Sequence, residues 1–241
     1  MPAPLHAFYR LYKWIWLGLD WFFPPYCGGC GTRGTHWCGN CQNTIEVIGC
    51  YCCQVCGKPQ TTLTLCKSCS SDLPRFTQLR SWGIFKGALR QAIHRLKYRR
   101  DISLGEILSR PLIDSFKESD WKVDLIMPVP LGVARLAERG YNQATLLARP
   151  LALAVNLPFS YKALSRIRDT ASQVDLNLRE RKENVKGAFQ AKHAAVAGKS
   201  ILVIDDVATS GSTINECAGA LLDAGANLVY GLTLARTPLV F

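Results

Sequence analysis

The sequence contains no uninterrupted apolar run long enough to cross a lipid bilayer. Its most hydrophobic stretch, residues 8–23, is interrupted by Arg10, Lys13 and Asp20, whereas a membrane-spanning helix needs about 20 consecutive apolar residues. We therefore expect no transmembrane span. The stretch is predicted to form a short helix that packs on the rest of the protein, and an amphipathic helix lying at a membrane surface is the alternative.

A secretory signal peptide is also missing from the first 20 residues. They contain no clear basic region followed by a purely apolar segment, and no pair of small residues that would mark a cleavage site. We expect a cytoplasmic location, and peripheral attachment at the inner membrane through the aromatic stretch is the alternative.

Acidic residues are scarce, with 18 Asp and Glu against 29 Lys and Arg, so the formal net charge is +11 at pH 7. This balance favours partners that carry phosphate or other anions, such as nucleotides, nucleic acid or anionic lipid. A length of 241 residues and a hydrophobic content of 48% exclude a purely disordered chain. They allow one large domain, or one domain with a small additional module.

Cysteine is almost absent outside one segment: ten of the eleven cysteines lie within residues 27–69, and the other is Cys217. The segment contains four C-x-x-C pairs, and two such pairs supply the four thiolates that structural zinc prefers. A reducing compartment favours metal over a disulfide framework, which is the alternative. The predicted ligands of two zinc ions are Cys27, Cys30, Cys38 and Cys41, and then Cys53, Cys56, Cys66 and Cys69.

Spacing allows more than one choice of ligands for the second zinc ion, unlike the first. Cys50 also stands three residues before Cys53, and Cys52 is a further surplus thiol. A cross-braced pairing of the four pairs therefore stays open. As a role for the module, a structural staple is favoured over direct contact with nucleic acid, and an adaptor toward a membrane or a protein is a third hypothesis.

After residue 74 the pattern changes to short apolar runs that alternate with helical periodicity. Buried strands are predicted at residues 123–127, 201–204 and 228–234, an edge strand at 79–85, and helices at 87–98, 102–116, 141–155 and 212–224. This alternation predicts an α/β domain with a central parallel sheet. The expected domains are an aromatic helical segment (1–26), a double zinc-ribbon-like module (27–74) and the α/β domain (75–241).

Residues 201–213 combine a buried strand, two adjacent carboxylates and a loop of small hydroxyl and glycine residues that opens a helix. Backbone N–H groups and the dipole at a helix N-terminus favour phosphate. The two carboxylates would bind ribose hydroxyls, directly or through Mg²⁺. An ordinary helix-capping turn needs neither the acid pair nor four hydroxyls. The predicted sugar-phosphate site comprises Asp205, Asp206, Val207, Ala208, Thr209, Ser210, Gly211, Ser212 and Thr213.

This segment resembles the signature with which type I phosphoribosyltransferases bind phosphoribosyl pyrophosphate (PRPP). Other segments are similar to the ComF, or GntX-like, family of competence proteins: Leu-Lys-Tyr-Arg at 96–99, Met-Pro-Val-Pro at 127–130, Glu-Arg-Gly-Tyr-Asn-Gln at 138–143, and the Arg- and Asn-containing stretch 166–189. With the cysteine module, nearly the whole chain resembles this family. The resemblance implies a type I phosphoribosyltransferase fold, a site for PRPP with Mg²⁺, and an association with uptake or use of external DNA.

Phosphoribosyl transfer expels pyrophosphate, so cations are needed near the leaving group. Within the resemblance, the loop after the Met-Pro-Val-Pro strand and a mobile loop at residues 166–187 are the places to look for them. The candidates are Val129, Pro130, Arg135 and Arg139 in the first region and Arg168 and Arg181 in the second. Arg139 is expected to act in catalysis with Asp205 and Asp206. Each arginine has the alternative of an exposed surface residue.

Residues 76–100 contain seven Lys or Arg and no acid. An apolar helical stripe within them leaves a second face that is basic and is formed by Arg90, His94, Lys97 and Arg99. This face could follow a nucleic-acid backbone or supply the pyrophosphate side of the PRPP site. A merely solvated basic helix is the alternative.

Two functions are consistent with these features. The first is a PRPP-dependent phosphoribosyltransferase, a pentosyl-transfer enzyme that serves DNA uptake, natural transformation or use of external DNA, with other DNA-uptake proteins as partners. The second is a non-catalytic module that binds single-stranded DNA and uses PRPP as a regulatory ligand. No sequence pattern identifies a nucleobase-binding pocket, so the second hypothesis stays open.

Overall fold

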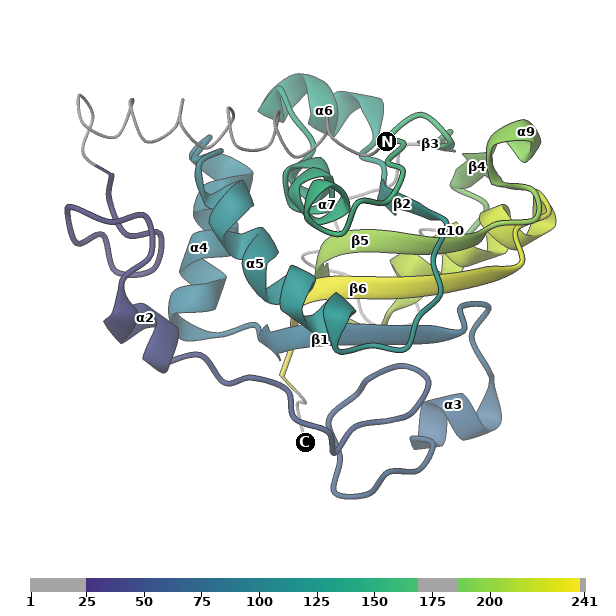
Figure 1. Cartoon of the computed structure of the whole chain (residues 1–241), viewed down its shortest axis with the longest axis horizontal. Coiled ribbons are helices and arrows are strands. Elements are labelled where there is room, and N and C mark those ends of the chain that lie inside the picture. Colours follow the sequence, from purple (N-terminus) through teal and green to yellow (C-terminus); the bar gives the residue numbers. More distant parts are fainter. Residues whose placement is uncertain (1–24, 169–185, 239–241) are drawn as a thin grey trace.

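The computed structural model describes residues 25–168 and 186–238, and Figure 1 shows how its elements are arranged. The helices are α2 (Gly39–Asn43), α3 (Lys67–Ser71), α4 (Gly87–Tyr98), α5 (Leu104–Lys117), α6 (Val133–Arg139), α7 (Gln143–Ala154), α9 (His193–Val196) and α10 (Ser212–Asp223). The strands are β1 (Gln78–Ile84), β2 (Leu125–Pro128), β3 (Leu164–Arg166), β4 (Phe189–Ala191), β5 (Ser200–Ala208) and β6 (Leu228–Arg236).

A parallel sheet of four strands, in the order β1-β6-β5-β2, forms the centre of the molecule. Its register pairs Pro128 of β2 with Ile204 of β5, and Arg236 of β6 with both Ala208 of β5 and Ile84 of β1. The carboxyl ends of the strands therefore meet at one edge, where ligands bind in open α/β sheets. β3 and β4 form a separate antiparallel pair.

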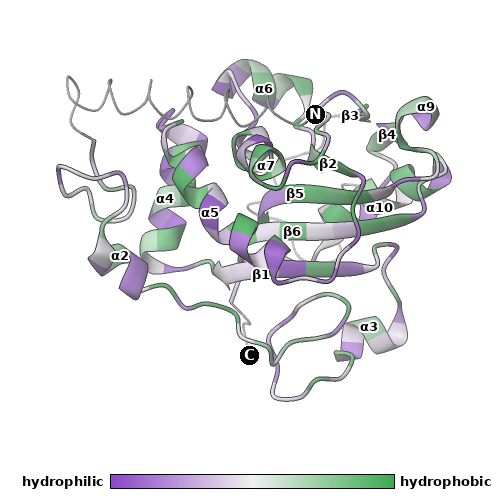
Figure 2. Ribbon diagram, viewed as in Figure 1, coloured by the Kyte–Doolittle hydropathy of each residue, from purple (hydrophilic) through white to green (hydrophobic). Residues whose placement is uncertain are grey.

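Helices cover both faces of the sheet, because successive strand residues point to opposite sides. Leu202 and Ile204 of β5 pack with residues of α4, α5 and α7, whereas Ile201 and Val203 pack with α10 and the β3–β4 pair. Figure 1 shows α5 and α7 on one side of the sheet and α10 on the other. In Figure 2 β5 is apolar over most of its length and becomes hydrophilic at its carboxyl end.

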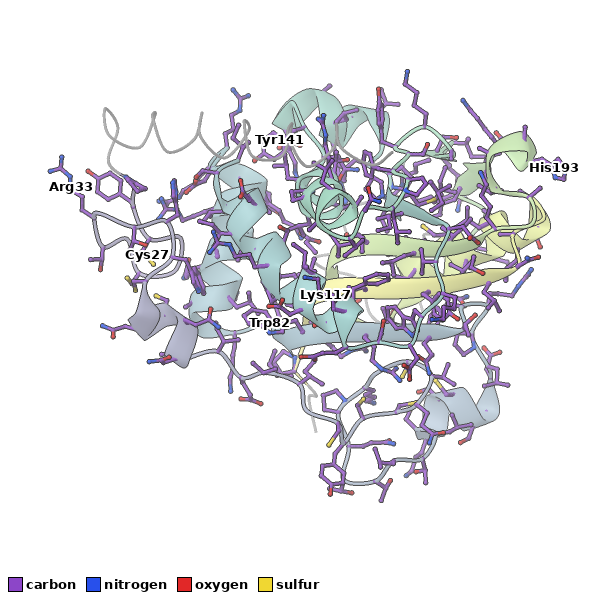
Figure 3. The ribbon with its side chains drawn as sticks, viewed as in Figure 1. Cys27, Arg33, Trp82, Lys117, Tyr141 and His193 are labelled. Carbon is purple, nitrogen blue, oxygen red and sulfur yellow. The ribbon has the colours of Figure 1, made fainter. Side chains whose placement is uncertain are left out.

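The cysteine-rich segment lies against the sheet and is not a separate body. The N–H groups of Ile48 and Ile84 donate to the carbonyls of Trp82 and Glu46, and the N–H of Leu79 donates to Val55. These contacts cover the outer edge of β1, which would otherwise be open to pairing with another chain. Figure 3 labels Trp82 on β1 and Cys27 in the part of the segment that lies beside α4.

The predicted fold class, an α/β domain with a central parallel sheet, is confirmed. The helix predicted at residues 87–98 coincides with α4, and the other predicted helices and strands differ from the observed ones by a few residues at their ends. The main difference is β5, which continues through Asp205 and Asp206 to Ala208. The sequence patterns did not predict α6, α9 or the β3–β4 pair, which are all short.

Candidate functional site

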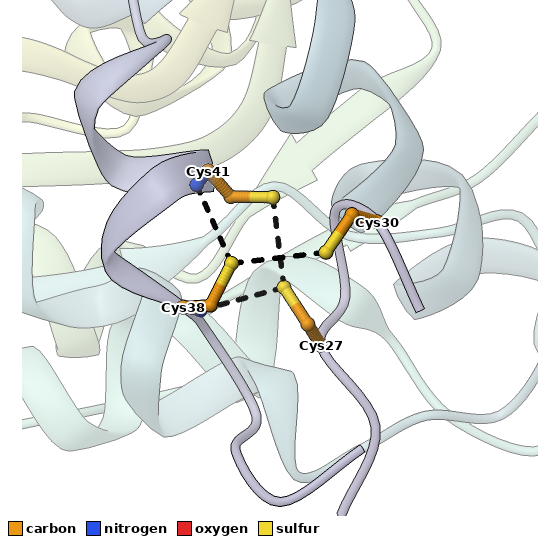
Figure 4. A group of neighbouring side chains, drawn as sticks. All are labelled: Cys27, Cys30, Cys38 and Cys41. Atoms are coloured by element: carbon orange, nitrogen blue, oxygen red, sulfur yellow. Dashed lines mark hydrogen bonds between the residues drawn. The ribbon is translucent and has the colours of Figure 1, made fainter. Parts of the chain in front are cut away.

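The first cysteine cluster brings together Cys27, Cys30, Cys38 and Cys41, whose sulfur atoms all lie within 4.8 Å of one another. The Sγ atoms of Cys27 and Cys41 are 3.6 Å apart, and those of Cys30 and Cys38 are 3.7 Å apart (Figure 4). Backbone N–H groups also point at the sulfurs: Cys38 donates to Cys27 Sγ and Cys41 donates to Cys38 Sγ. This cluster is partly exposed.

The second cluster is formed by Cys53, Cys56, Cys66 and Cys69, and all four side chains are buried. Its sulfurs also lie within 4.8 Å of one another, with Cys56 Sγ and Cys66 Sγ 3.6 Å apart. The N–H of Cys66 donates to Cys53 Sγ. The two clusters therefore use consecutive pairs, and a cross-braced arrangement is not formed.

Both clusters fit zinc. Four sulfurs at tetrahedral corners, each about 2.3 Å from a zinc ion, lie about 3.8 Å apart, which agrees with the separations of 3.6 and 3.7 Å. A disulfide needs sulfurs about 2.05 Å apart, and all cysteines in the described part of the chain are free thiols. Each cluster would hold one ion in a closed structural site.

Each cluster contains thiols with a lowered pKa, Cys27 and Cys30 in the first and Cys53 in the second. Burial raises the pKa of Cys27, but the backbone N–H groups of Cys30, Cys38 and Gly29 outweigh it and lower the pKa to about 6. In the second cluster, backbone N–H groups likewise outweigh burial and lower the pKa of Cys53 to about 6. Because metal binding requires thiolates, these hydrogen bonds favour the metal-bound form.

Cys50 and Cys52 belong to neither cluster. Cys50 is exposed and Cys52 is buried, and the backbone N–H of Cys52 donates to the carbonyl of Cys50. The structure thus brings together the two groups of four cysteines that the spacing predicted.

The candidate phosphate loop joins β5 to α10. Val207 and Ala208 end the strand, Thr209, Ser210 and Gly211 form the loop, and Ser212 and Thr213 begin the helix. Gly211 has a φ of +85°, and no side chain caps the helix. Ser210 and Ser212 share a short hydroxyl–hydroxyl hydrogen bond. The N–H of Ser212 donates to Ser210 Oγ over 3.3 Å, so an anion that binds at this N-terminus would replace a local contact.

The two adjacent acids have different surroundings. Asp206 points toward the α4 side and is only 3% exposed, and its Oδ2 lies 2.6 Å from Lys97 Nζ. Asp205 carries a charge that acts on Cys217 of α10. The two carboxyl groups are close enough to interact with each other, and both residues stand at the edge of the sheet beside the loop.

Burial raises the pKa of Asp205 to about 8, and the negative charge of Asp206 adds to the effect, while Lys97 opposes it. The side chain also accepts a hydrogen bond of 2.9 Å from the N–H of Asp206. A cation next to Asp205 would restore its ionised form, as Mg²⁺ does when it binds carboxylates.

The basic face of α4 reaches this edge. Its apolar stripe, Leu89, Ala92, Ile93 and Leu96, is fully buried as predicted. Arg90, His94 and Arg99 are exposed, and Lys97 is half-buried against Asp206. Burial and the charges of Arg90 and Lys97 lower the pKa of His94, which the charge of Asp206 partly offsets. Lys97 thus belongs to the candidate site, whereas Arg90, His94 and Arg99 face solvent.

The loop after β2 is fixed beside β5. The N–H of Val129 donates to the Ile204 carbonyl over 2.8 Å, and Asn142 Nδ2 donates to the Val129 carbonyl over 2.8 Å. Asn142 also caps α7 by accepting from the N–H of Ala144. Pro130 follows in this loop, which places the Met-Pro-Val-Pro segment next to the acid pair.

The predicted pyrophosphate arginines lie in different surroundings. Arg135 and Arg139 are half-buried on α6, where the Arg139 guanidinium lies 5.0 Å from the centre of the Tyr98 ring and donates to Gln143 Oε1 over 2.9 Å. Arg168 is exposed and donates to the Lys186 carbonyl. Arg181 lies outside the described residues, as does most of the predicted mobile loop.

Two positions were not predicted from the sequence. Tyr141, labelled in Figure 3, donates its hydroxyl to the Leu96 carbonyl and so fixes the end of α4 against the α6–α7 connection. Arg236 at the end of β6 contacts both the phosphate loop and the second cysteine cluster. Tyr141 lies in the family-like segment 138–143 but was assigned no role, and for Arg236 the signal that can be sought is an arginine that ends an otherwise apolar strand.

In residues 25–168 and 186–238, no helix has both the length and the apolar character needed to span a membrane.

Comparison with known families agrees with this architecture. The double zinc ribbon domain matches residues 18–75, and the phosphoribosyl transferase domain matches residues 106–238. Fold and clusters together define a protein with the type I phosphoribosyltransferase fold and an N-terminal double zinc ribbon. More narrowly, the chain belongs to the ComF family of proteins.

Its relatives align along most of their length. The chain is 34% identical to DNA utilization protein YhgH of Escherichia coli (strain K12), over 84% of this chain and 92% of the relative. It is 29% identical to Competence protein F of Haemophilus influenzae, over 83% and 90%, and 28% identical to Competence protein ComFC of Bacillus subtilis, over 83% and 84%.

Solved structures are more distant. A glutamine PRPP amidotransferase from Bacillus subtilis is 20% identical with a TM-score of 0.36, over 55% of this chain and 25% of that chain. An adenine phosphoribosyltransferase from Thermoanaerobacter pseudethanolicus is 14% identical with a TM-score of 0.36, over 61% of this chain and 86% of that chain.

Proposed function

We propose that the protein binds PRPP together with Mg²⁺ at the junction of β5 and α10. The observation that carries this proposal is the N-terminus of α10, which begins at a left-handed Gly211 without a side-chain cap, in the loop that follows the strand carrying Asp205 and Asp206. Such an N-terminus offers unpaired N–H donors and a positive dipole end to a phosphate group. The carboxylates supply the hydroxyl and cation ligands that the ribose end of PRPP requires.

The site residues have distinct proposed roles. The backbone of residues 207–213, with the hydroxyls of Thr209 and Thr213, binds the 5-phosphate. Asp205 and Asp206 bind the ribose hydroxyls, directly or through Mg²⁺. Val129 and Pro130 face the pyrophosphate, and Arg135, Arg139, Arg168 and Arg181 are the candidates that neutralise its charge.

The proposed reaction is pentosyl transfer. As the bond between ribose C1 and pyrophosphate breaks, positive charge develops on the ribose ring and negative charge on the departing group. Asp205 and Asp206 hold the ribose in place beside the first charge, and Arg139 stabilises the second. Because relatives of the chain are named as DNA utilization and competence proteins, we place this activity in the uptake or use of external DNA.

Calorimetry on the intact protein tests the proposed site. Titration with PRPP in the presence of Mg²⁺ should give saturable binding at one site, and an Asp205→Ala, Asp206→Ala double variant should lose it. Arg75→Ala is a matched control, because Arg75 pairs with exposed Asp223 at the opposite end of α10. Absence of any wild-type heat of binding at saturating ligand would reject the proposal.

A second function is favoured by the exposed part of the α4 face. Arg90, His94 and Arg99 face solvent and would be available to a nucleic-acid backbone while PRPP occupies the loop. In this alternative the protein binds single-stranded DNA without catalysis and PRPP regulates the binding. Release of pyrophosphate from PRPP in the presence of bases and amines would identify an enzyme.

The DNA-binding alternative has its own test. If α4 follows a phosphate backbone, neutralising Arg90, Lys97 and Arg99 should weaken binding of single-stranded DNA and flatten its dependence on salt, by about 0.7 in the logarithmic slope per lost contact. An unchanged slope would exclude this surface.

A further inference from the structure

Arg236 joins the second cysteine cluster to the candidate phosphate loop. It is the last residue of β6 and lies in register between Ala208 of β5 and Ile84 of β1, at the carboxyl edge of the sheet. Its Nη2 donates to the carbonyl of Cys56, a member of the cluster, and its Nη1 lies 3.4 Å from the carbonyl of Thr209 in the loop. The side chain is only 3% exposed.

Within the described ranges, none of the ion pairs includes the Arg236 guanidinium, and burying an unpaired charge is strongly unfavourable. Burial lowers the pKa of Arg236, and negative charge on the thiols of Cys56, Cys52, Cys66 and Cys53 opposes this effect. Zn²⁺ with four thiolates carries a formal charge of −2, so an occupied second cluster would supply the missing counter-charge.

The contact with Thr209 also sets the direction of the next amide. A peptide unit is planar and trans, so its C=O and N–H point in opposite directions. With the Thr209 carbonyl directed at Arg236, the N–H of Ser210 is directed away from it, toward the open side of the loop. Arg236 therefore orients one of the donors proposed to bind phosphate.

We propose that Arg236 is a positioning residue that couples metal in the second cluster to the conformation of the phosphate loop. The identity of the loop's ligand rests on the proposed function, whereas the coupling rests on the contacts of Arg236 alone. Coupling of binding free energies is reciprocal, so ligand on the loop should also raise the affinity of the cluster for zinc.

A nearby arginine provides a matched control. Arg80 also donates to the segment between Cys53 and Cys56 of the second cluster. Its Nη2 donates to the Gln54 carbonyl over 2.9 Å, and its Nη1 donates to the Val55 carbonyl. Among the described residues, its hydrogen bonds go to that segment and to β1, and none goes to the phosphate loop. Arg80→Gln thus loosens the cluster without acting on Thr209.

The test uses the intact zinc-loaded protein and three variants: Arg236→Gln, Arg236→Lys and Arg80→Gln. Hydrogen exchange is measured on peptides that cover residues 205–214, and zinc release is followed with a chromogenic chelator. Losing a hydrogen bond from a charged donor should speed exchange in the loop about ten-fold or more. Lysine keeps the charge but cannot bridge two carbonyls, so Arg236→Lys should release zinc nearly as slowly as wild type and still show the faster loop.

The outcomes separate the coupling from the proposed function. Faster loop exchange in both Arg236 variants, with wild-type exchange in Arg80→Gln, supports the coupling. Wild-type loop exchange in a folded Arg236→Lys overturns it, whether or not Arg236→Gln folds. If the wild-type protein fails to bind PRPP while the Arg236 variants loosen the loop, the proposed function fails and the coupling stands.

Discussion

At the scale of single residues, two neighbouring acids of β5 have different energetic roles. Asp206 is buried and paired with Lys97, 2.6 Å away, so its charge is balanced within the protein. Within residues 25–168 and 186–238 Asp205 forms no ion pair, and its pKa is raised to about 8. Asp206 is therefore held in place by its pairing with Lys97. The burial of Asp205 costs folding free energy, and a bound cation would relieve that cost.

Asp205→Asn should stabilise the protein in the absence of ligand and abolish PRPP binding. The folded-state pKa is raised above the unfolded value near 3.8, so ionisation favours the unfolded chain as pH rises through the interval from about 4 to 8. We expect Asn to gain about 1–2 kcal/mol at pH 8 and nothing at pH 3. Urea unfolding at several pH values measures this gain, and a gain that shrinks with rising pH would contradict the assignment.

Asp206→Asn is the matched comparison and should have the opposite effect on stability. It leaves the Lys97 ammonium, whose side chain is 20% exposed, without its partner. Breaking such a pair should cost about 1–3 kcal/mol in the same unfolding experiment. Equal effects of the two substitutions would show that the acids do not differ in the way proposed.

At the scale of elements, the junction of β5 and α10 was largely predictable, and its surroundings were not. The apolar run and the hydroxyl-rich loop are local patterns, and they predicted the strand, the loop and the start of α10. The pairing of Lys97 with Asp206 joins residues 109 positions apart, as the numbering shows, and no local periodicity encodes such a contact. Short elements such as α6 and β3 are formed by packing against the sheet, so their own sequence gives a weak signal.

Gly211→Ala should disrupt the junction. Gly211 has a φ of +85°, which is unfavourable for an L side chain, and a Cβ there would lie 3.2 Å from Leu79 Cδ2. We expect a loss of about 1–2 kcal/mol in stability and a weakened affinity for PRPP with Mg²⁺. Thermal unfolding and calorimetry measure the two effects.

Gly219→Ala in the same helix is its control. A Cβ at Gly219 meets no atom within 4 Å, and alanine is the better helix former, so stability should rise by roughly 0.5–1 kcal/mol. If both substitutions destabilised the protein equally, the left-handed conformation of Gly211 would not be the cause.

At the scale of the whole molecule, the two cysteine clusters contact the α/β domain at separate places. Arg95 on α4 donates to the Cys27 carbonyl of the first cluster, and Arg236 on β6 donates to the Cys56 carbonyl of the second. Residues 46–48 between the clusters cover the edge of β1. Because these contacts reach both α4 and the sheet, we expect metal to stabilise the entire fold.

Removing the metal should therefore lower the unfolding temperature of the entire protein. Metal analysis should return two zinc ions per chain, and a strong chelator should lower Tm by about 10 °C or more, since each kcal/mol shifts Tm by about 2–4 °C in a protein of this size. Restoration of Tm by added zinc is the control. A Tm that responds to reductant and not to chelator would instead indicate disulfides.

A crystal structure of the intact protein with PRPP and Mg²⁺ tests the location of the ligand most directly. We expect the 5-phosphate within hydrogen-bonding distance of the N–H groups of residues 210–213, with the ribose and its cation next to Asp205 and Asp206. PRPP bound away from the β5–α10 junction, with the loop left empty, would contradict it.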